Sequence, residues 1–188
     1  MKKFLMVLIS WCLAVSLSAC GTLSPQKTVE NYMEALKTLD FTTANTYLSN
    51  NDEVEEILPE EEEFCKLMVK NLDYKIISET ISEDKTSAVV KLDVTNTNFE
   101  NFVTEYLKAA ISEVITGGLS NAGNEDLNVE LLKSTFEKCE SSKVTNTVEL
   151  KLIKNENGWK IETNDEFVDA VFGGVSKAMG LFNKTSNQ

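Results

Sequence analysis

The sequence contains no histidine and no arginine in 188 residues. Without histidine it cannot form a Ser-His-Asp or Cys-His nucleophile system, a His-ligated zinc site or an imidazole general base. Without arginine it has no guanidinium fork for carboxylate or phosphate groups, so lysines or backbone amides would have to bind any phosphate. These absences exclude most hydrolase templates, and the sequence predicts no catalytic residue, no metal site and no cofactor.

Positive charge is also scarce. The chain has 18 basic residues, all lysines, against 30 acidic ones, and its net charge is −12. Because such a surface repels phosphate backbones and anionic lipid headgroups, nucleic acid is not an expected partner. The densest acidic run, residues 60–63, lacks the alternating oxygen ligands and the glycine of a calcium-binding loop, so it indicates a solvated helix start.

An apolar run follows Met1-Lys2-Lys3 and ends at Ala19. A basic start, an apolar stretch and small residues before a cleavage point are the layout of a secretory signal peptide. The run is interrupted by serines and has no basic stop-transfer flank, whereas a membrane span needs about 20 largely apolar residues. Residues 1–19 are therefore expected to be a leader that directs export, and not a transmembrane helix.

The stretch Leu17-Ser18-Ala19-Cys20 resembles the bacterial lipobox. The resemblance implies that the Cys20 thiol receives a diacylglycerol and that the leader is cut before this residue. Two acyl chains would then hold the protein to membrane lipid without spanning the bilayer. We expect a lipidated N-terminus and short tether at residues 20–25, on the extracytoplasmic face of the cell membrane. An ordinary cysteine after the cleavage site and a retained anchor stay open as alternatives.

Two further cysteines, Cys65 and Cys139, would remain in the exported chain, because Cys12 leaves with the leader. Outside the cytoplasm a disulfide between them is permitted. Alternatively, they are two separate buried thiols, since each falls on the apolar side of an expected helix. The sequence leaves both possibilities open.

Helical patterns dominate the first part of the exported chain. Ser24-Pro25 has the form of a helix cap followed by proline at the first helical position. Apolar residues then recur every three or four positions as far as Leu39, and a shorter helix is expected after Asp40, which predicts a helical hairpin. Pro59 is expected to open a third helix whose first turn carries the acidic run.

A period of two replaces the helical period from Asp73 onward. Residues 74–81 and 87–94 predict one β-hairpin, and residues 143–154 and 159–163 predict a second. Between the hairpins, helices are expected over residues 99–116 and 125–140. Capping boxes are expected at Thr97 with Glu100 and at Thr163 with Glu166. A short helix over residues 167–172, a last amphipathic segment over residues 175–182 and a polar tail at residues 183–188 complete the chain.

A family resemblance rests on three stretches. "SPQKTVENYMEALKTLDFTTANTYLS" is similar to the opening of nuclear transport factor 2-like (cystatin-like α+β) domains, and "TNTVELKLIKNENGWKIETNDEFVDAVFGG" is similar to their closing hairpin. Together with "NFVTEYLKAAISEVITGGLS", they resemble uncharacterised lipoproteins of Gram-positive bacteria. The resemblance implies one α+β domain over residues 26–182, in which a curved antiparallel sheet wraps an N-terminal helical hairpin. The two-helix insertion between the β-hairpins, Thr97 to Glu140, is expected to plug or cover the concave side of the sheet.

The fold by itself does not choose a function. We expect a membrane-anchored, noncatalytic module that binds a small molecule or an envelope protein, of unknown specificity. The alternative is an isomerase or dehydratase that uses Asp40 with a tyrosine in an apolar pocket, as some members of the superfamily do. The available tyrosines also fit structural positions on apolar stripes; they are Tyr32, Tyr47, Tyr74 and Tyr106. Trp159 is expected to be a core residue and not a ligand platform.

Overall fold

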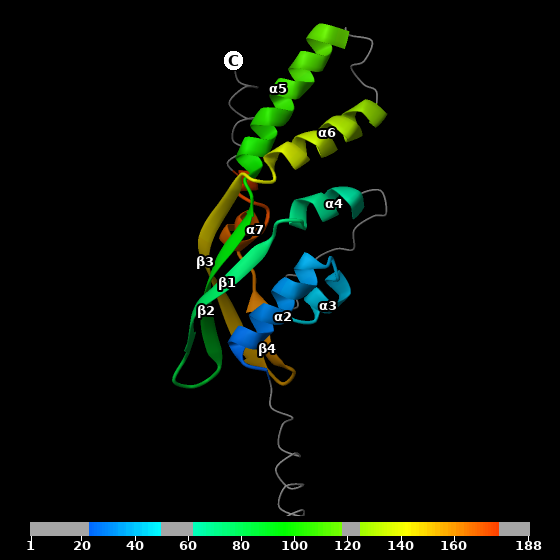
Figure 1. Ribbon diagram of the computed structural model, residues 1–188. Coiled ribbons are helices and arrows are strands. Elements are labelled where there is room, and N and C mark those ends of the chain that lie inside the picture. The colour runs from blue at the N-terminus through cyan, green and yellow to red at the C-terminus, as the bar shows by residue number, and fades with distance from the viewer. Residues whose placement is uncertain (1–22, 50–61, 118–124, 177–188) are drawn as a thin grey trace, which may run out of the picture.

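The computed structural model describes residues 23–49, 62–117 and 125–176 (Figure 1). In these residues the chain forms an α+β fold with six helices and a four-stranded antiparallel sheet. The elements, in chain order, are α2 (Pro25–Lys37), α3 (Phe41–Asn45), α4 (Glu62–Val69), β1 (Asp73–Ile81), β2 (Ser87–Thr97), α5 (Phe99–Gly117), α6 (Glu125–Cys139), β3 (Lys143–Asn155), β4 (Gly158–Glu162) and α7 (Asp165–Val171).

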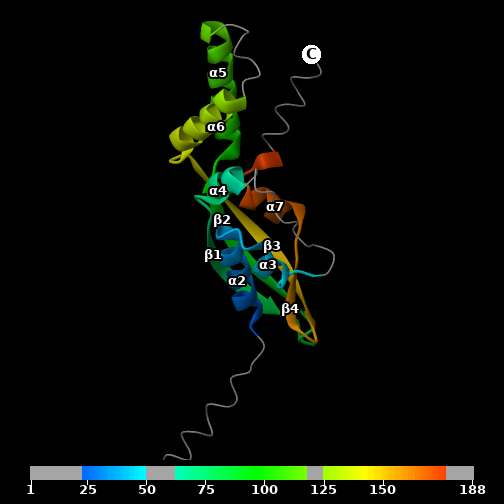
Figure 2. The same cartoon turned by 90° about the vertical axis from the view of Figure 1, so that its right-hand side faces the viewer.

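The strands lie in the order β1-β2-β3-β4, and each pairs with its neighbour in antiparallel fashion. The two central strands, β2 and β3, are separated in sequence by α5 and α6. Their pairing runs from Ser87 opposite Ile153 to Thr97 opposite Lys143, so the chain leaves and re-enters the sheet at the same end. The insertion consequently extends beyond that end of the sheet (Figures 1 and 2). The expectation that it covers the concave side of the sheet is wrong.

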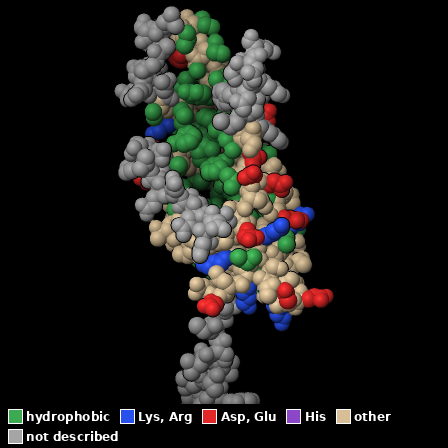
Figure 3. Space-filling model, turned by 180° about the vertical axis from the view of Figure 1, so that it is seen from behind, with side chains coloured by type: hydrophobic (Ala, Val, Ile, Leu, Met, Phe, Trp, Pro, Cys, Tyr) green, Lys and Arg blue, Asp and Glu red, His purple; other side chains and the backbone are tan. Residues whose placement is uncertain are grey.

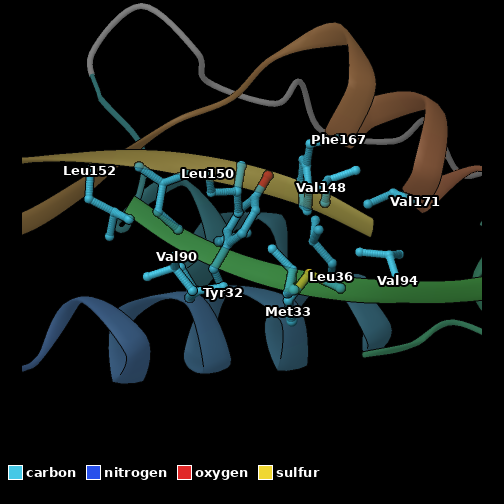
Figure 4. Packing of buried hydrophobic residues seen from close by; sticks show 14 of the residues in the cluster. Tyr32, Met33, Leu36, Val90, Val94, Val148, Leu150, Leu152, Phe167 and Val171 are labelled. Carbon is cyan, nitrogen blue, oxygen red and sulfur yellow. The ribbon is translucent and has the colours of Figure 1, made fainter. Parts of the chain in front are cut away.

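Helices α2 and α7 cover one face of the sheet instead. Helix α2 begins as expected, because the Ser24 side chain accepts a hydrogen bond from the Lys27 amide at 3.1 Å and Pro25 follows it. Its apolar stripe packs against β1, β2 and β4, and α7 packs against β2 and β3. The residues that fill this main core are buried (Figure 4); they include Val29, Tyr32, Met33, Leu36, Val90, Leu92, Val94, Leu150, Leu152, Ile161 and Phe167.

The predicted alternation along the strands is confirmed. Ala88, Val90, Leu92 and Val94 are buried, whereas the residues between them are half-buried. On β3 the inward residues Val148, Leu150 and Leu152 are buried and their neighbours are exposed. Trp159 is 7 % exposed and belongs to this core, as the sequence predicted.

A second apolar cluster lies between α4, α5 and α6. Its buried members are Met68, Phe102, Val103, Phe136 and Cys139. The rings of Phe102 and Phe136 lie 5.1 Å apart between centroids, a favourable separation for an aromatic pair. The inserted helices therefore pack on α4 and on one another, and they form a helical arm next to the sheet.

Asn96, near the end of β2, joins the arm to the sheet. Its side chain is buried, and its amide nitrogen donates to the carbonyl oxygens of Met68 at 2.8 Å and Val171 at 2.6 Å. These carbonyls belong to the last turns of α4 and α7, where helix carbonyls lack partners within the helix. One side chain thus satisfies the ends of two helices.

The caps of α5 and α7 lie one residue later than predicted, so Glu100 and Glu166 do not stand three residues after the cap, as a capping box requires. Asn98, not Thr97, caps α5, because its side-chain oxygen accepts from the Asn101 amide at 3.1 Å. Thr97 is still the last residue of β2, and its hydroxyl accepts from the side chain of Asn71 at 2.9 Å. Asn164 caps α7 in the same way, accepting from the Phe167 amide at 2.8 Å.

Several expectations concern residues outside the described ranges. They are the leader and Cys20, the start of the third helix at Pro59, most of the amphipathic segment at residues 175–182, and the polar tail. Helix α4 carries Glu62 and Glu63 in its first turn, as the acidic-start interpretation requires.

Gly173 allows α7 to meet the start of α5, and this contact gives a first prediction. A β-carbon at Gly173 would lie 1.9 Å from the Thr97 carbonyl oxygen, whereas one at Gly174 would meet nothing within 4 Å. Both glycines have positive φ, which costs alanine about 1–2 kcal/mol at either position. Overpacking adds about 1–3 kcal/mol at Gly173 alone.

Gly173→Ala should therefore lower the free energy of unfolding in urea clearly more than the matched control Gly174→Ala. Equal losses in the two variants would show that the close approach of Gly173 to Thr97 does not constrain the fold.

Candidate functional site

The sheet face that the resemblance assigns to ligands is filled by side chains. Val90, Leu92 and Leu150 on the strands are fully buried, and Met33 and Phe167 from the helices are at most 1 % exposed (Figure 4). A ligand could enter this space only by displacing core residues. The candidate site must therefore be sought outside the main core.

An open cleft of about 520 Å³ lies between the end of α2, α3 and α4. We call it the α2–α4 cleft. Leu39 shapes one wall, because its positive φ of 57° turns the chain from α2 into α3. The cleft is lined by Lys37, Thr38, Leu39, Asp40, Phe41, Thr42, Glu62, Lys66, Val69, Lys70 and Leu72.

Three lysines and two carboxylates line this cleft. The Lys66 ammonium lies 2.7 Å from Glu62, Lys37 lies 3.6 Å from Glu34, and Lys70 pairs with Glu140. Hydrogen bonds to Glu62 and to Glu140 raise the pKa of Lys66 and of Lys70, so both stay protonated at neutral pH. The cleft thus combines ammonium groups with an apolar lining from Phe41, Val69 and Leu72.

Asp40 lies at the rim of the cleft but lacks the properties of a catalytic acid. Its carboxylate accepts a hydrogen bond from the Thr43 amide at 2.9 Å and caps α3. Hydrogen bonds from the side chain and then the backbone of Thr43 hold the pKa of Asp40 below its usual value. The carboxylate is ionised at neutral pH, whereas a general acid needs a raised pKa.

The four tyrosines do not gather around Asp40. Tyr32 is buried in the main core, Tyr47 and Tyr74 pack at its edge, and Tyr106 belongs to the second cluster. The Tyr74 hydroxyl donates to the Glu30 carbonyl at 3.4 Å. Burial, followed by the neighbouring Glu34, raises the pKa of Tyr74 to about 12, so the phenol stays neutral.

Cys65 and Cys139 are not joined by a disulfide in the structure. Two ion pairs join α4 to α6: Glu63–Lys133, at 3.6 Å, and Lys70–Glu140. The residue numbers differ by 70 in both pairs, so the two helices run side by side in the same direction and residue 135 lies level with Cys65. Cys139 therefore lies four residues beyond the level of Cys65, about 6 Å along the helices.

Packed helices are also about 8–10 Å apart, and a disulfide needs Cα atoms within about 7 Å. The packing of α4 and α6 thus favours two separate thiols over a disulfide. Burial also raises the pKa of the Cys139 thiol above its usual value.

The sequence did not indicate the cleft lysines as a group. Lys66 on α4 and Lys70 directly after it are four residues apart, a spacing that the sequence shows and that puts both on one side of a helix. Lys37, however, comes from the end of α2. No local pattern says that this end lies across from α4, so the third ammonium could not have been assigned to the cleft.

No family model matches the chain, and no curated protein matches it. Among the described helices, none combines the length and apolar character needed to cross a membrane. Within the same residues, Cys, Asp and Glu side chains form no group of three that could hold a metal ion.

Proposed function

We propose that this protein is a lipid-anchored, extracytoplasmic binding module, and that its α2–α4 cleft takes an anionic ligand with an apolar portion. The proposal has three parts: the anchor at Cys20, a nuclear transport factor 2-like domain, and a noncatalytic site. Each part is supported by different residues.

The anchor is supported by the lipobox-like stretch and by the position of α2. Only three residues separate Cys20 from the cap residue Ser24. Helix α2 begins at the end of the molecule opposite to the α5–α6 arm (Figures 1 and 2). A lipid on Cys20 would therefore hold that end close to the bilayer and direct the arm away from it.

With such an anchor, the cleft would lie clear of the membrane. The cleft lies at the C-terminal end of α2, and a helix of 13 residues is about 20 Å long. A soluble ligand or a segment of another envelope protein could reach the site without meeting the headgroups.

The domain type is supported by helices α2 and α3 next to an antiparallel sheet and by the closing β3–β4 hairpin. Relatives of this type use the covered face for ligands, but here that face is the main core. Binding at the outer α2–α4 cleft is compatible both with this domain type and with a sheet face that is filled by core residues.

The ligand class rests on the charges and lining of the cleft. Lys37, Lys66 and Lys70 bring three ammonium groups to one cleft in a chain whose overall charge is −12. Each of these lysines already pairs with a carboxylate at the surface, and because such pairs are weak an anionic group would share or displace them. Phe41, Val69 and Leu72 would contact the apolar part of the ligand. The ionised Asp40 and the dispersed tyrosines favour binding over catalysis.

The anchor predicts the outcome of one substitution in a Gram-positive host. Cys20→Ser should abolish the acylated form and release the protein from the membrane fraction, because the thiol is the site of alkylation. The matched control Cys12→Ser, within the expected leader, should leave acylation unchanged. Intact mass and membrane partitioning measure both. An unacylated wild-type chain would contradict the anchor.

The cleft predicts the binding of 8-anilinonaphthalene-1-sulfonate, an anion with apolar rings, measured by its fluorescence. A variant with Lys37→Gln, Lys66→Gln and Lys70→Gln should raise the dissociation constant at least about tenfold, as expected from the loss of about 1.4 kcal/mol or more. A control with Lys75→Gln, Lys91→Gln and Lys143→Gln, on the strands, should bind as the wild type does. Equal affinity in both triple variants would contradict the proposed site.

A further inference from the structure

The outer half of α5 carries an apolar face that is open to solvent. Leu107, Ile111, Val114 and Ile115 follow the spacing of one side of a helix. Their exposed fractions are 38 %, 59 %, 40 % and 76 %, in that order. We call these four residues the α5 stripe. Seen from behind, hydrophobic side chains gather over the helices of the arm, whereas charged ones gather over the lower half of the molecule (Figure 3).

Helix α6 packs on a different side of α5. The ring of Phe102 contacts Phe136 of α6, with 5.1 Å between the ring centroids. Ile111 follows Phe102 by nine residues, or about two and a half turns, so it points to the opposite side of the helix. The α5 stripe is thus turned away from the second apolar cluster.

An apolar helix face of this length calls for a partner. The segment from Leu107 to Gly117 has 11 residues, and isolated helices shorter than about 12–15 residues are marginal in water. Contiguous apolar patches on protein surfaces commonly mark interaction sites. A second helix laid along the stripe would cover Ile111 and Ile115, in the way that amphipathic helices dock on apolar surfaces.

Two carboxylates next to the α5 stripe determine which charge suits its partner. Glu100 precedes Ile111 by 11 residues, or about three turns, and therefore stands on the same side of α5. Glu113 is next to Val114, about 100° around the helix. Both glutamates are exposed, and neither forms an ion pair with any residue that the structure describes.

The other charges of α5 do not offset these two carboxylates. Lys108, the only lysine of the helix, is already paired with Glu105 at 2.7 Å. The whole chain has a net charge of −12, which attracts cations over a distance and repels a second copy of the same chain. Charge complementarity therefore favours a partner that is cationic as well as apolar on one face.

The spacing of the carboxylates indicates the length of that partner. Glu100 and Glu113 are 13 residues apart, which is about 20 Å along the helix axis. A partner helix of about four turns has the same length. It can bring a cationic side chain near each carboxylate while its apolar residues cover the α5 stripe.

We propose that the α5 stripe binds a cationic amphipathic helix, a peptide segment of about four turns that carries lysines or arginines beside an apolar face. The site is separate from the α2–α4 cleft and does not depend on the lipid anchor. It gives the arm a role of its own, the capture of basic peptides.

A synthetic peptide of two Lys-Leu-Ala-Lys-Leu-Ala-Lys repeats tests the proposal. Fluorescence anisotropy of the labelled peptide measures its dissociation constant from the full chain. The wild-type protein should bind the peptide, bind it less tightly at higher salt, and show slower hydrogen exchange at residues 107–116 when the peptide is present. A peptide in which glutamate replaces each lysine should not bind.

Substitution of isoleucines separates the stripe from the overall charge. Ile111→Ser with Ile115→Ser should raise the dissociation constant at least about tenfold, because it removes apolar contacts and leaves every charge in place. The matched control Ile77→Ser with Ile153→Ser changes two strand isoleucines that are 48 % and 39 % exposed, and it should bind as the wild type does. Unchanged circular dichroism shows that both variants are folded.

Substitution of glutamates tests the charge complementarity. Glu100→Gln with Glu113→Gln should raise the dissociation constant about threefold, because two exposed ion pairs with the peptide are lost. The control Glu83→Gln with Glu156→Gln removes the same charge from the two turns between strands, at the other end of the sheet, and should bind as the wild type does.

Four results would overturn the proposal. If the wild type does not bind the basic peptide, the stripe is not its site. If the two isoleucine variants bind the peptide equally, overall charge alone attracts it. If the glutamate peptide binds as tightly as the lysine peptide, charge does not select the partner. If the protein is a dimer that protects residues 107–116 without peptide, a second copy of the chain covers the stripe.

Discussion

The side-chain amide of Asn96 is the interaction on which the rest of the structure depends. Its nitrogen donates to carbonyls at the ends of α4 and α7, and its oxygen accepts from the Thr97 amide at 2.7 Å. The side chain is 1 % exposed, so water cannot replace these partners. A buried carbonyl that loses its donor costs about 1–3 kcal/mol, which is a large fraction of the stability of a domain this size.

The position of Asn96 explains how two apolar clusters form one domain. Val171 belongs to the main core, and Met68 belongs to the second cluster. Because Asn96 bonds to the backbone of both, the end of β2 fixes the arm relative to the sheet. Gly173 adds to this junction, since only a residue without a side chain fits against the Thr97 carbonyl. The junction also sets where the chain runs after α7.

The arrangement separates the molecule into regions with different roles. The main core occupies the sheet face that could have held a ligand, and under the proposed function the ligand binds in the α2–α4 cleft instead. The N-terminus of α2 lies at the opposite end from the arm (Figure 1). Under the proposed anchor, the protein stands on the membrane with the cleft above the headgroups and the arm furthest away.

Local patterns predicted the elements well because their causes are local. The period of two at Ala88, Val90, Leu92 and Val94 identified a strand buried on one side, and Ser24-Pro25 marked the start of α2. The capping residues were misplaced by one position because the sheet continues through Thr97, a tertiary effect that the letters do not show.

Long-range pairings were not predictable from the sequence. Asn96 looks like any polar residue at a strand end, and nothing near it in sequence identifies Met68 or Val171 as its partners. The same holds for the cleft, because Lys37 and Lys70 line it together only in the folded chain. The insertion was expected over the sheet, since the pairing of Thr97 with Lys143 was unknown.

The most direct test of the Asn96 junction is urea unfolding of wild type and Asn96→Ala, followed in parallel by two signals. Fluorescence of Trp159, the one tryptophan after the expected leader, reports the main core, and circular dichroism at 222 nm reports the helices. The account predicts coincident transitions in the wild type and, in the variant, loss of helical signal at lower urea than loss of fluorescence. Coincident transitions in the variant at the wild-type midpoint would contradict it.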